Sequence, residues 1–428
     1  MTSQTSMGTS YLIVGSGVFG TSTAYHISLT HPNSSITLLD RSSSFPCSLA
    51  ASHDCNKIVR ADYEDIFYCE LALKAREMWK NDPLYKPYYH ESGFVIVDDT
   101  GLGRRVIDNY EKLGILDHQA RIAGPDEMKT LYGGLFKGTD WRGVKEVFVN
   151  EGSGWAEATK AVRKVTEMAM ANGVKFIEGD VENLILTIDG TCLGVMTKDG
   201  RTFRADKIIL STGAGTAKLL ADSAPQMHHI LAEDRITAAA IVSGHVHLSE
   251  TEYDGIRNTP VFDHAVGNVL GAVLPPTNGI LKFYLDVTLK HTTLHERSGH
   301  MISAPPDEAD QAQRNVPKKL QECYRVMRGI YSELAENMKF DSFRMCWDGI
   351  TPDQDFIISA HPRCQNLHIA TGGSFHGWKF LPIIGDYVVQ MLDNKLDANL
   401  LKRWAWDRDQ KGSVHKNFVP KRELRDLI

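Results

Sequence analysis

Short apolar runs that end at glycines or acidic residues divide the chain into predicted elements. Residues 11–14 form the first run, and they lead directly into the glycine-rich segment 15–20 and a segment of helical character. Such a run, without polar alternation, is typical of a buried parallel strand. A second run at 35–39 ends at Asp40. The chain therefore begins with a strand, a glycine turn, a helix, a second strand and an acid.

Further segments extend this α/β pattern. Buried strands are predicted at residues 93–97, 174–177, 206–210 and 367–370, and helices at 71–79, 156–172, 315–338 and 382–392. Residues 236–300 combine Thr, Val and Ile runs with Gly and Pro breaks, which predicts a strand-rich region. The sequence thus predicts strands that alternate with helices, and a separate strand-rich part.

Composition narrows the class of protein. With 428 residues, of which 42% are hydrophobic and 23% charged, the chain can form two or three packed domains. The formal net charge of −6 argues against nucleic-acid binding as the main role. The seven cysteines include no CxxC pair, so neither a disulfide framework nor a metal site is expected. No apolar stretch reaches the roughly 18 residues of a membrane span.

The two ends of the chain carry no recognisable targeting signal. The first ten residues are polar, unlike a secretory signal peptide, and the last four are Arg-Asp-Leu-Ile rather than a peroxisomal Ser-Lys-Leu end. We therefore expect reduced thiols and a cytoplasmic location.

The segment Gly15-Ser-Gly-Val-Phe-Gly20 has the spacing of a dinucleotide-binding loop. Gly15 and Gly17 allow a tight turn and a close approach of the backbone to a pyrophosphate, and Gly20 lets the helix pack on the strand. Asp40 lies 20 residues beyond Gly20, where a carboxylate accepts hydrogen bonds from a ribose and disfavours a 2′-phosphate. The plainer interpretation is a glycine-rich turn in which Asp40 caps a helix.

The loop by itself fits NAD and FAD equally. Two observations favour FAD: the loop lies close to the N-terminus, and two further strand–glycine segments, 207–215 and 367–373, lie far downstream. A cofactor as large as FAD needs residues from distant segments, and the gaps between them leave room for a second domain.

Several ordered segments carry a family resemblance together with this loop. They are Ser52-His-Asp-Cys-Asn-Lys-Ile-Val-Arg60, residues 79–90, Gly279-Ile-Leu-Lys282, Met345-Cys346-Trp347, residues 355–358 and Ser374-Phe-His-Gly-Trp-Lys379. In this order they resemble the FAD-dependent amine oxidases that include monomeric sarcosine oxidase, fructosyl amino acid oxidase (amadoriase), and saccharopine and pipecolate oxidases. The match covers nearly the whole chain.

The resemblance implies a two-domain flavoprotein of α/β class. A discontinuous Rossmann-like FAD-binding domain would comprise residues 10–90, 150–230 and 340–400, and a mixed-sheet α+β substrate domain would comprise 91–149 and 231–339. Residues 401–428 would form a C-terminal tail that packs on the site. The implied reaction oxidises a secondary amine to an imine, which water hydrolyses, while O2 is reduced to H2O2. The implied partners are a small amino-acid-derived substrate and O2, and the implied state is a monomer.

The resemblance also assigns roles to five residues. Cys346 would form the 8α-S-cysteinyl bond to FAD, and Lys282 would lie over the flavin and activate oxygen. Lys379 would lie near the flavin and the substrate carboxylate, Arg60 would bind that carboxylate, and Lys57 would lie near the flavin. The plainer interpretations are a buried apolar cysteine, a solvated strand lysine and ordinary surface charges.

A sixth candidate is Asp286, four residues beyond Lys282, where sugar-amine oxidases carry a glutamate and sarcosine oxidases a histidine. The resemblance extends the expected cofactor contacts to residues around the glycine loop and in later segments, namely Val18, Phe19, Arg41, Ser52, His53, Val181, Gly213, Phe375 and Gly377.

Departures from the family pattern bear on the substrate. Residues 79–90 look most like the amadoriase and saccharopine oxidase branch, but residues 403–408 depart from the fructosyl amino acid oxidase pattern and place Asp407 where that pattern has a carboxylate-binding arginine. Arg60 could replace that arginine. An N-substituted amino acid of the saccharopine, pipecolate or N-alkyl type therefore fits best, with a fructosyl amino acid as the alternative. An NAD-linked dehydrogenase and a non-catalytic flavin-binding protein are the rival classes.

Overall fold

The predicted glycine loop lies at the carboxyl end of an inner strand of the first of the two main sheets. The computed structural model describes residues 8–306, 313–314, 316–411 and 420–427. This six-stranded sheet has the order β21 (Ile357–Ala360), β22 (Leu367–Thr371), β13 (Lys207–Leu210), β1 (Ser10–Val14), β2 (Ser35–Asp40) and β9 (Lys175–Glu178). All neighbours are parallel except β21 and β22. The carboxyl ends of the parallel strands therefore meet along one edge, which is where such sheets bind ligands.

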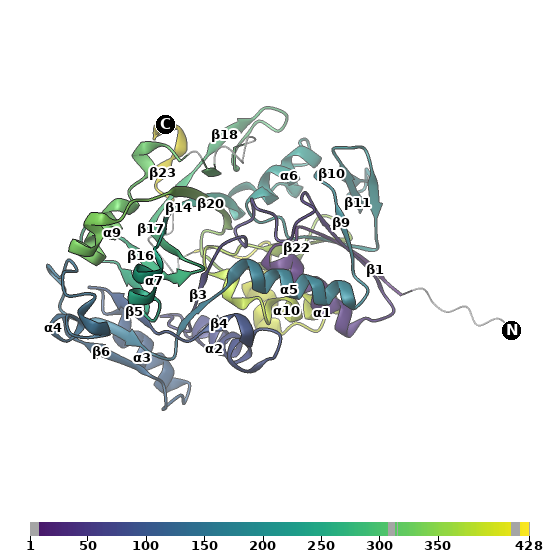
Figure 1. Cartoon of the computed structure of the whole chain (residues 1–428). Coiled ribbons are helices and arrows are strands. Elements are labelled where there is room, and N and C mark those ends of the chain that lie inside the picture. Colours follow the sequence, from purple (N-terminus) through teal and green to yellow (C-terminus); the bar gives the residue numbers. More distant parts are fainter. Residues whose placement is uncertain (1–7, 307–312, 315, 412–419, 428) are drawn as a thin grey trace.

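Three helices pack together against this sheet: α1 (Val18–Thr30), α5 (Ala158–Ala171) and α10 (Ile384–Leu392). Figure 1 shows them side by side, although they come from the beginning, the middle and the end of the chain. The approach of α1 and α10 is close, because a Cβ on Gly385 would lie 2.2 Å from the backbone of Ser22. The discontinuous packing that FAD-binding segments require is thus present.

The second main sheet has nine strands. Eight follow the order β20 (Ser342–Ile350), β14 (Thr237–His247), β17 (Ile280–Lys290), β16 (Gly271–Thr277), β15 (Val261–His264), β5 (Phe94–Val97), β7 (Val147–Asn150) and β6 (Ala120–Ala123), while β23 (Arg422–Glu423) pairs with β17. Cross-strand pairing places Cys346 opposite Ile241 and Lys282 opposite both His245 and Leu274.

The two faces of this sheet belong to different cores. Phe94, Leu274 and Tyr284 pack in the core that also contains residues of α1 and α10, whereas their neighbours Val95 and Phe283 pack in a second core with α9 (Cys323–Tyr331). Side chains alternate between faces along a strand, so Lys282, Tyr284 and Asp286 are directed to the first face. The nine-stranded sheet therefore presents these polar residues toward the six-stranded part.

The remaining elements form smaller sheets and connecting helices. The small sheets are β3 (Lys57–Val59), β8 (Gly154–Ala156) and β4 (Tyr89–His90); β10 (Val181–Leu186), β11 (Cys192–Thr197) and β12 (Thr202–Arg204); and β18 (Thr292–His295) and β19 (His300–Ser303). The helices are α2 (Ile66–Asn81), α3 (Leu102–Lys112), α4 (Pro125–Met128), α6 (Thr216–Ser223), α7 (Glu250–Ile256) and α11 (Ala398–Arg403).

The predicted α/β class, with a mixed-sheet second part, is confirmed. The single helix predicted over 315–338 is wrong, because α9 covers only Cys323–Tyr331 and Ser332 has a φ of 46°, which a continuing helix cannot accommodate; residue 315 lies outside the described residues. The domain boundaries stay a prediction, and β20 lies in the nine-stranded sheet. Among the described helices, none is long and apolar enough to cross a membrane.

Candidate functional site

The glycine loop connects β1 to α1 in a tight turn. Gly15 has a φ of 100°, and a Cβ on Gly20 would lie only 1.8 Å from the carbonyl oxygen of Gly15, so neither position accepts a larger residue. Gly17 is the N-cap of α1, whose first turn contains no acidic residue. The backbone amides at this helix N-terminus form a cradle that fits the negative charge of a pyrophosphate.

Asp40 ends β2 beside the same loop. Its buried carboxylate accepts hydrogen bonds from the Ser16 backbone N–H at 2.6 Å and from the Ser16 hydroxyl at 2.9 Å. Burial raises the pKa of Asp40, and the bonds from Ser16 oppose that rise. Asp40 does not cap α1, whose N-cap is Gly17, so the plainer interpretation of this acid does not hold for that helix.

Residues from distant segments reach the loop. The Ser52 hydroxyl accepts a hydrogen bond from the Val18 N–H at 2.9 Å. Phe19 contacts Gly377, where an added Cβ would lie 3.5 Å from its ring. Phe375 has a φ of 62°, and its N–H donates to the buried carboxylate of Asp348 at 2.8 Å. Asp348 was not predicted, because no motif distinguishes it in the sequence.

Three predicted cofactor residues lie along the strand ends. Arg41 is half-exposed and lies 3.8 Å from Asp180. Val181 begins β10, close to Asp40, whose carbonyl accepts a hydrogen bond from the Gly179 N–H. Gly213 follows β13, which pairs with β1 next to the loop.

Asp54 is the centre of a charge cluster built from two distant segments. Its Oδ2 lies 2.9 Å from the Nζ atom of Lys282 and 2.9 Å from the Nζ atom of Lys57. Lys282 also donates to the carbonyl oxygen of Asn56 at 2.7 Å. The cluster therefore fixes strand β17 to the segment that leads into β3. Asp54 was not predicted as a site residue, because its importance depends on lysines that only the fold brings to it.

The charges of this cluster hold one another ionised. Burial favours the neutral form of Asp54, but Lys282, Lys57 and Arg344 outweigh it and lower the pKa of Asp54 well below its usual range. Asp54 in turn raises the pKa of Lys57 against the effect of burial. The side chains of Asp54 and Lys282 are only 8% and 5% exposed, so water screens their attraction weakly.

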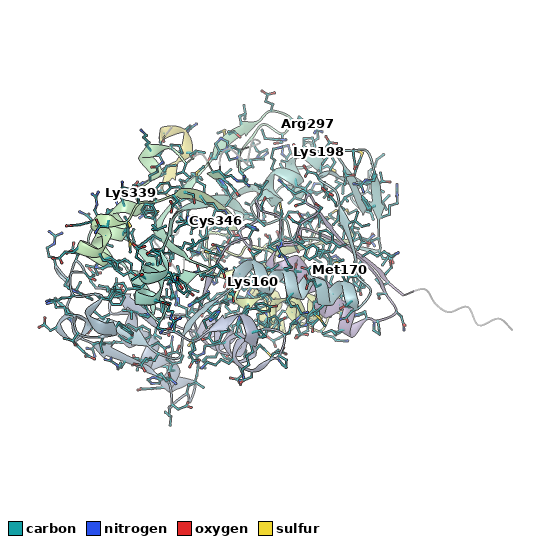
Figure 2. All side chains as sticks on the ribbon, in the orientation of Figure 1. Lys160, Met170, Lys198, Arg297, Lys339 and Cys346 are labelled. Carbon is teal, nitrogen blue, oxygen red and sulfur yellow. The ribbon has the colours of Figure 1, made fainter. Side chains whose placement is uncertain are left out.

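Lys57 also approaches the thiol of Cys346, with 4.0 Å between Nζ and Sγ. Cys346 is buried on β20, and Figure 2 shows it in the interior of the molecule. Lys57 thus places a positive charge beside this sulfur, where a cysteine that reacts as a nucleophile needs one. Burial raises the pKa of the thiol to about 12 at Cys323 and Cys364, and also at Cys55, where the charge of Lys282 opposes the rise.

His53 precedes this cluster along the chain. Its carbonyl oxygen accepts a hydrogen bond from Arg344, and its half-buried imidazole has a pKa lowered by burial and by the charge of Arg344. The ring is therefore neutral at pH 7. His53 therefore lies beside the cluster and contacts Arg344 through its backbone carbonyl rather than through an ionised side chain.

A second cationic group lies at the end of β3. The Arg60 guanidinium lies over the rings of Tyr63 and Phe94, at 5.0 and 5.2 Å from their centroids, and donates to the carbonyl oxygen of Asp62. Within the described ranges, no carboxylate forms an ion pair with Arg60. Its charge is thus available for a bound anion.

Lys379 completes this group. It is 5% exposed and donates to the Tyr63 hydroxyl at 2.7 Å and to the carbonyl oxygen of His376 at 2.8 Å. Burial and the charge of Arg60 lower the pKa of Lys379 well below its usual range. A carboxylate bound between Lys379 and Arg60 would offset both effects, so the pair is suited to an anionic ligand.

Asp286 lies on the same face of β17 as Lys282. It is 7% exposed, and its nearest titratable neighbour is Asp263 on β15. The structure thus pairs the predicted residue with a second acid that sequence reasoning missed, because a lone aspartate within an apolar strand carries no motif.

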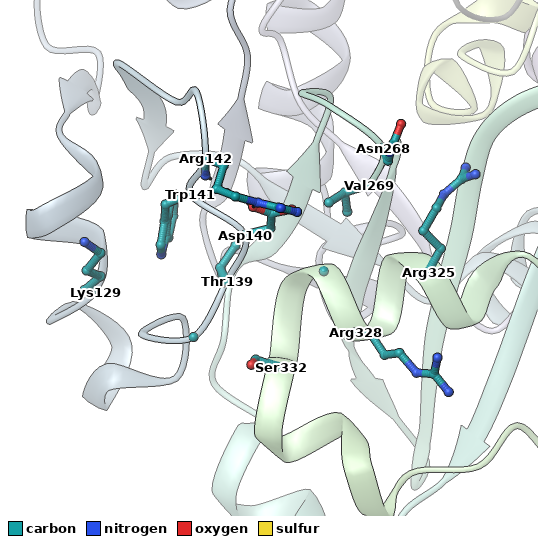
Figure 3. Close-up of a pocket in the computed structure, with 12 residues that line it drawn as sticks. Lys129, Thr139, Asp140, Trp141, Arg142, Asn268, Val269, Arg325, Arg328 and Ser332 are labelled. Atoms are coloured by element: carbon teal, nitrogen blue, oxygen red, sulfur yellow. Dashed lines mark hydrogen bonds and ion pairs between the residues drawn. The ribbon is translucent and has the colours of Figure 1, made fainter.

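Two further features do not belong to this site. Asp54, Cys55 and His245 offer ligand atoms within 4.8 Å of one another, but the two lysines that bind Asp54 repel a metal cation. A surface pocket of about 850 Å³ lies elsewhere, beside α9, and is lined by residues such as Trp141 and Arg325 (Figure 3). None of the residues that line it was predicted as a site residue, and none is a cysteine.

Comparison with known proteins identifies the family. Residues 10–391 match the FAD dependent oxidoreductase family, and the chain belongs to it. The chain is 27% identical to L-saccharopine oxidase of Schizosaccharomyces pombe, over 96% of each protein, and 25% identical to monomeric sarcosine oxidase of Bacillus sp. strain NS-129, over 93% of this chain and 96% of the relative. Among solved structures, fructosyl peptide oxidase from E. terrenum superposes with a TM-score of 0.85 and 26% identity, covering 98% of this chain and 97% of the other.

The family membership decides between the classes that the glycine loop left open. The protein is an FAD-dependent oxidoreductase, which confirms the predicted enzyme class and FAD as the cofactor and excludes the NAD-linked interpretation of the loop. Covalent attachment of the FAD to Cys346 stays a prediction. The predicted resemblance to sarcosine, saccharopine and fructosyl amino acid oxidases is confirmed as well.

Proposed function

We propose that this protein oxidises the secondary amine of an N-substituted amino acid, with FAD bound covalently to Cys346. The observation that carries the proposal is the convergence of Cys346, Lys57 and Lys282 around Asp54, from segments that are far apart in the sequence. A thiol beside an ammonium, together with a buried lysine on β17, supplies the two features that a covalently held, oxygen-reactive flavin needs. The names of the saccharopine and sarcosine oxidase relatives support the substrate class.

The bound FAD would accept a hydride equivalent from the substrate and transfer the electrons to O2. The amides of the glycine loop and Asp40 would hold its pyrophosphate and ribose, and the Cys346 thiolate would be the attachment point. Lys282, whose Nζ atom lies 2.9 Å from Asp54, would stabilise negative charge that develops on oxygen.

Arg60 and Lys379 would bind the substrate carboxylate. Arg60 presents a planar donor group already fixed between two aromatic rings, which reduces the entropy lost on binding. The aromatic surroundings also disfavour a charged amine, and only a neutral amine can donate electrons. Water then hydrolyses the imine, and H2O2 is the second product.

A fructosyl amino acid is the alternative substrate, because the solved structures that superpose well include fructosyl peptide oxidases. The C-terminal segment argues against it. Arg403 is held by Asp65 at 2.6 Å and by Asp355 at 2.9 Å, so its charge is balanced within the protein. Asp407 is 59% exposed and lies 3.4 Å from Arg235. The carboxylate would thus depend on Arg60.

The purified holoenzyme tests this function directly. Under anaerobic conditions, its yellow colour should bleach with one or more of saccharopine, pipecolate, sarcosine, N-methylated aromatic amino acids and fructosyl-valine, and air should restore the colour with formation of H2O2. A yellow protein that none of these amines bleaches would contradict the proposed substrate class. The monomeric state and the cytoplasmic location expected from the sequence stay predictions.

A further inference from the structure

Asp263 and Asp286 form a carboxyl pair on the inner face of the nine-stranded sheet. Asp263 on β15 lies opposite Ala272 on β16, which in turn lies opposite Tyr284 on β17, two residues from Asp286. The two carboxyl groups lie within hydrogen-bonding reach of each other, and such a contact requires a proton between them. Because side chains alternate between the two faces of a sheet, both carboxyl groups lie on the face that also presents Lys282.

Each acid of the pair has an oxygen without a partner. Asp286 is 7% exposed, and within the described residues neither its Oδ1 atom nor the Oδ1 atom of Asp263 has a hydrogen-bond partner. A buried acceptor without a donor is unfavourable, because it has lost its hydrogen bonds to water and gained none in return. No hydrogen bond within the described residues occupies these two oxygens, and a dialkylammonium group carries two N–H donors.

The surroundings of the two acids favour a state in which they share one proton. Burial raises the pKa of both acids, and the neighbouring charge of Asp263 raises that of Asp286 further, since two adjacent carboxylates cannot both ionise in a dry site. The charged groups that face the pair are Arg60, which favours ionisation of both acids, and Asp98, which opposes that of Asp263. Tyr284 is partly buried, and burial raises the pKa of its hydroxyl, so it stays neutral. The pair thus has a net charge of −1.

Arg60 connects the pair to the proposed substrate site. Its guanidinium lies over Phe94 on β5, the strand that pairs with β15 beside Asp263. In an amino acid, the carboxylate and the amine nitrogen are attached to the same carbon. A carboxylate held by Arg60 therefore leaves the attached ammonium close to the opposite charge of the acid pair.

We propose that the Asp263–Asp286 pair binds the substrate's secondary ammonium group and accepts its proton. The inference rests on the proposed function, because it assigns a role toward that substrate. In the step, one N–H bond of the ammonium breaks and one O–H bond forms on the pair: the ammonium becomes a neutral amine, and the singly protonated pair becomes doubly protonated. No electrons are exchanged. The proton returns to water when the product leaves.

Infrared spectroscopy tests the proton without any turnover. The wild-type holoenzyme at pH 7 should show the carbonyl stretch of a buried protonated carboxylic acid, and Asp286→Asn should lack that band. The exposed acid Asp254, on α7, supplies the matched control, and Asp254→Asn should retain the band. A wild-type enzyme without such a band would overturn the proposal whatever the enzyme oxidises.

Anaerobic flavin reduction tests the proton transfer. With N-ethylglycine at pH 7, Asp286→Asn and Asp263→Asn should reduce the flavin about 10²- to 10⁴-fold more slowly than wild type and Asp254→Asn. The rate deficit of the two variants should become tenfold smaller for each unit by which the pH is raised. The deficit should also be smaller with N-(2,2,2-trifluoroethyl)glycine, whose amine is already neutral at pH 7. Equal losses with both amines would overturn the role. If wild type bleaches with neither amine but shows the infrared band, the substrate assignment fails instead.

Discussion

The ammonium nitrogen of Lys57 lies 4.0 Å from the sulfur of Cys346, although 289 residues separate them in the chain. Asp54 holds that lysine in place with a contact of 2.9 Å, so the ammonium is fixed rather than free to move into water. This relationship distinguishes Cys346 from the other cysteines of the described chain, and it supports the proposed attachment of FAD.

Replacing Cys346 with Ser should abolish covalent attachment, because a hydroxyl beside Lys57 is far less acidic than a thiol. We expect FAD to wash out of the acid-precipitated variant and flavin fluorescence to disappear from its band on a denaturing gel. Cys323→Ser removes a buried thiol that donates to the carbonyl oxygen of Val242 rather than approaching a lysine, and it should keep the fluorescent band. Retention of the band by the Cys346 variant would show that another residue holds the cofactor.

Replacing Lys282 with Met should impair oxygen reduction selectively. The lysine supplies a charge that only the oxygen reaction requires, and the loss of one such group costs about 10²- to 10³-fold in rate. Stopped-flow measurements should show that slowing in reoxidation by O2, with a much smaller change in anaerobic reduction by substrate. Lys290→Met, on the same strand but paired with Glu423 near the surface, is the control. Equal losses in both half-reactions would contradict the role.

Replacing Arg60 with Gln should weaken binding of the substrate carboxylate. The loss of a charge-assisted pair in a desolvated site costs about 2–4 kcal/mol, which corresponds to a decrease of roughly 30- to 1,000-fold in kcat/KM. Steady-state assays should show the same deficit in wild type when the carboxylate of the substrate is replaced by an amide, and no further deficit in the variant. An additional loss with the amide substrate would place the carboxylate elsewhere. Arg104→Gln, at an exposed pair with Glu146, should behave as wild type.

Replacing Asp54 with Asn should destabilise the fold, because two lysines would remain in a site where burial opposes their charge. The loss of one partner from a buried ion pair lowers the free energy of unfolding by about 3–5 kcal/mol, which urea denaturation can measure. Asp126→Asn, at a pair exposed to solvent, should leave the free energy of unfolding nearly unchanged.

The same variant has a defined pH dependence. The folded-state pKa of Asp54 is lowered, so its stabilisation is complete above the unfolded-state pKa of about 3.9 and is lost as the pH falls through the folded-state value. The difference between wild type and Asp54→Asn should therefore be constant from pH 7 to about pH 5 and decrease only in more acidic solutions. A difference that changes between pH 6 and pH 7 would contradict this assignment.

Local features of the fold could be predicted from the sequence. Gly15, Gly20 and Asp40 follow from short-range geometry: a left-handed turn, a helix that packs against its own strand, and the end of the next strand. The single helix predicted over 315–338 was wrong, because the apolar periodicity of the sequence continues past Ser332, where the backbone φ becomes positive and the helix ends.

The sequence by itself determined the nucleotide-binding loop, the α/β class and, through resemblance, the candidates Cys346, Lys282 and Arg60. Only the tertiary structure decided which acids act on them. Asp54 becomes important because β17 brings Lys282 to it, and Asp263 because β15 and β17 lie on either side of β16. The physical reason is that the charge state of a buried group depends on its neighbours across strands, and those neighbours follow from pairing and register rather than from any local pattern.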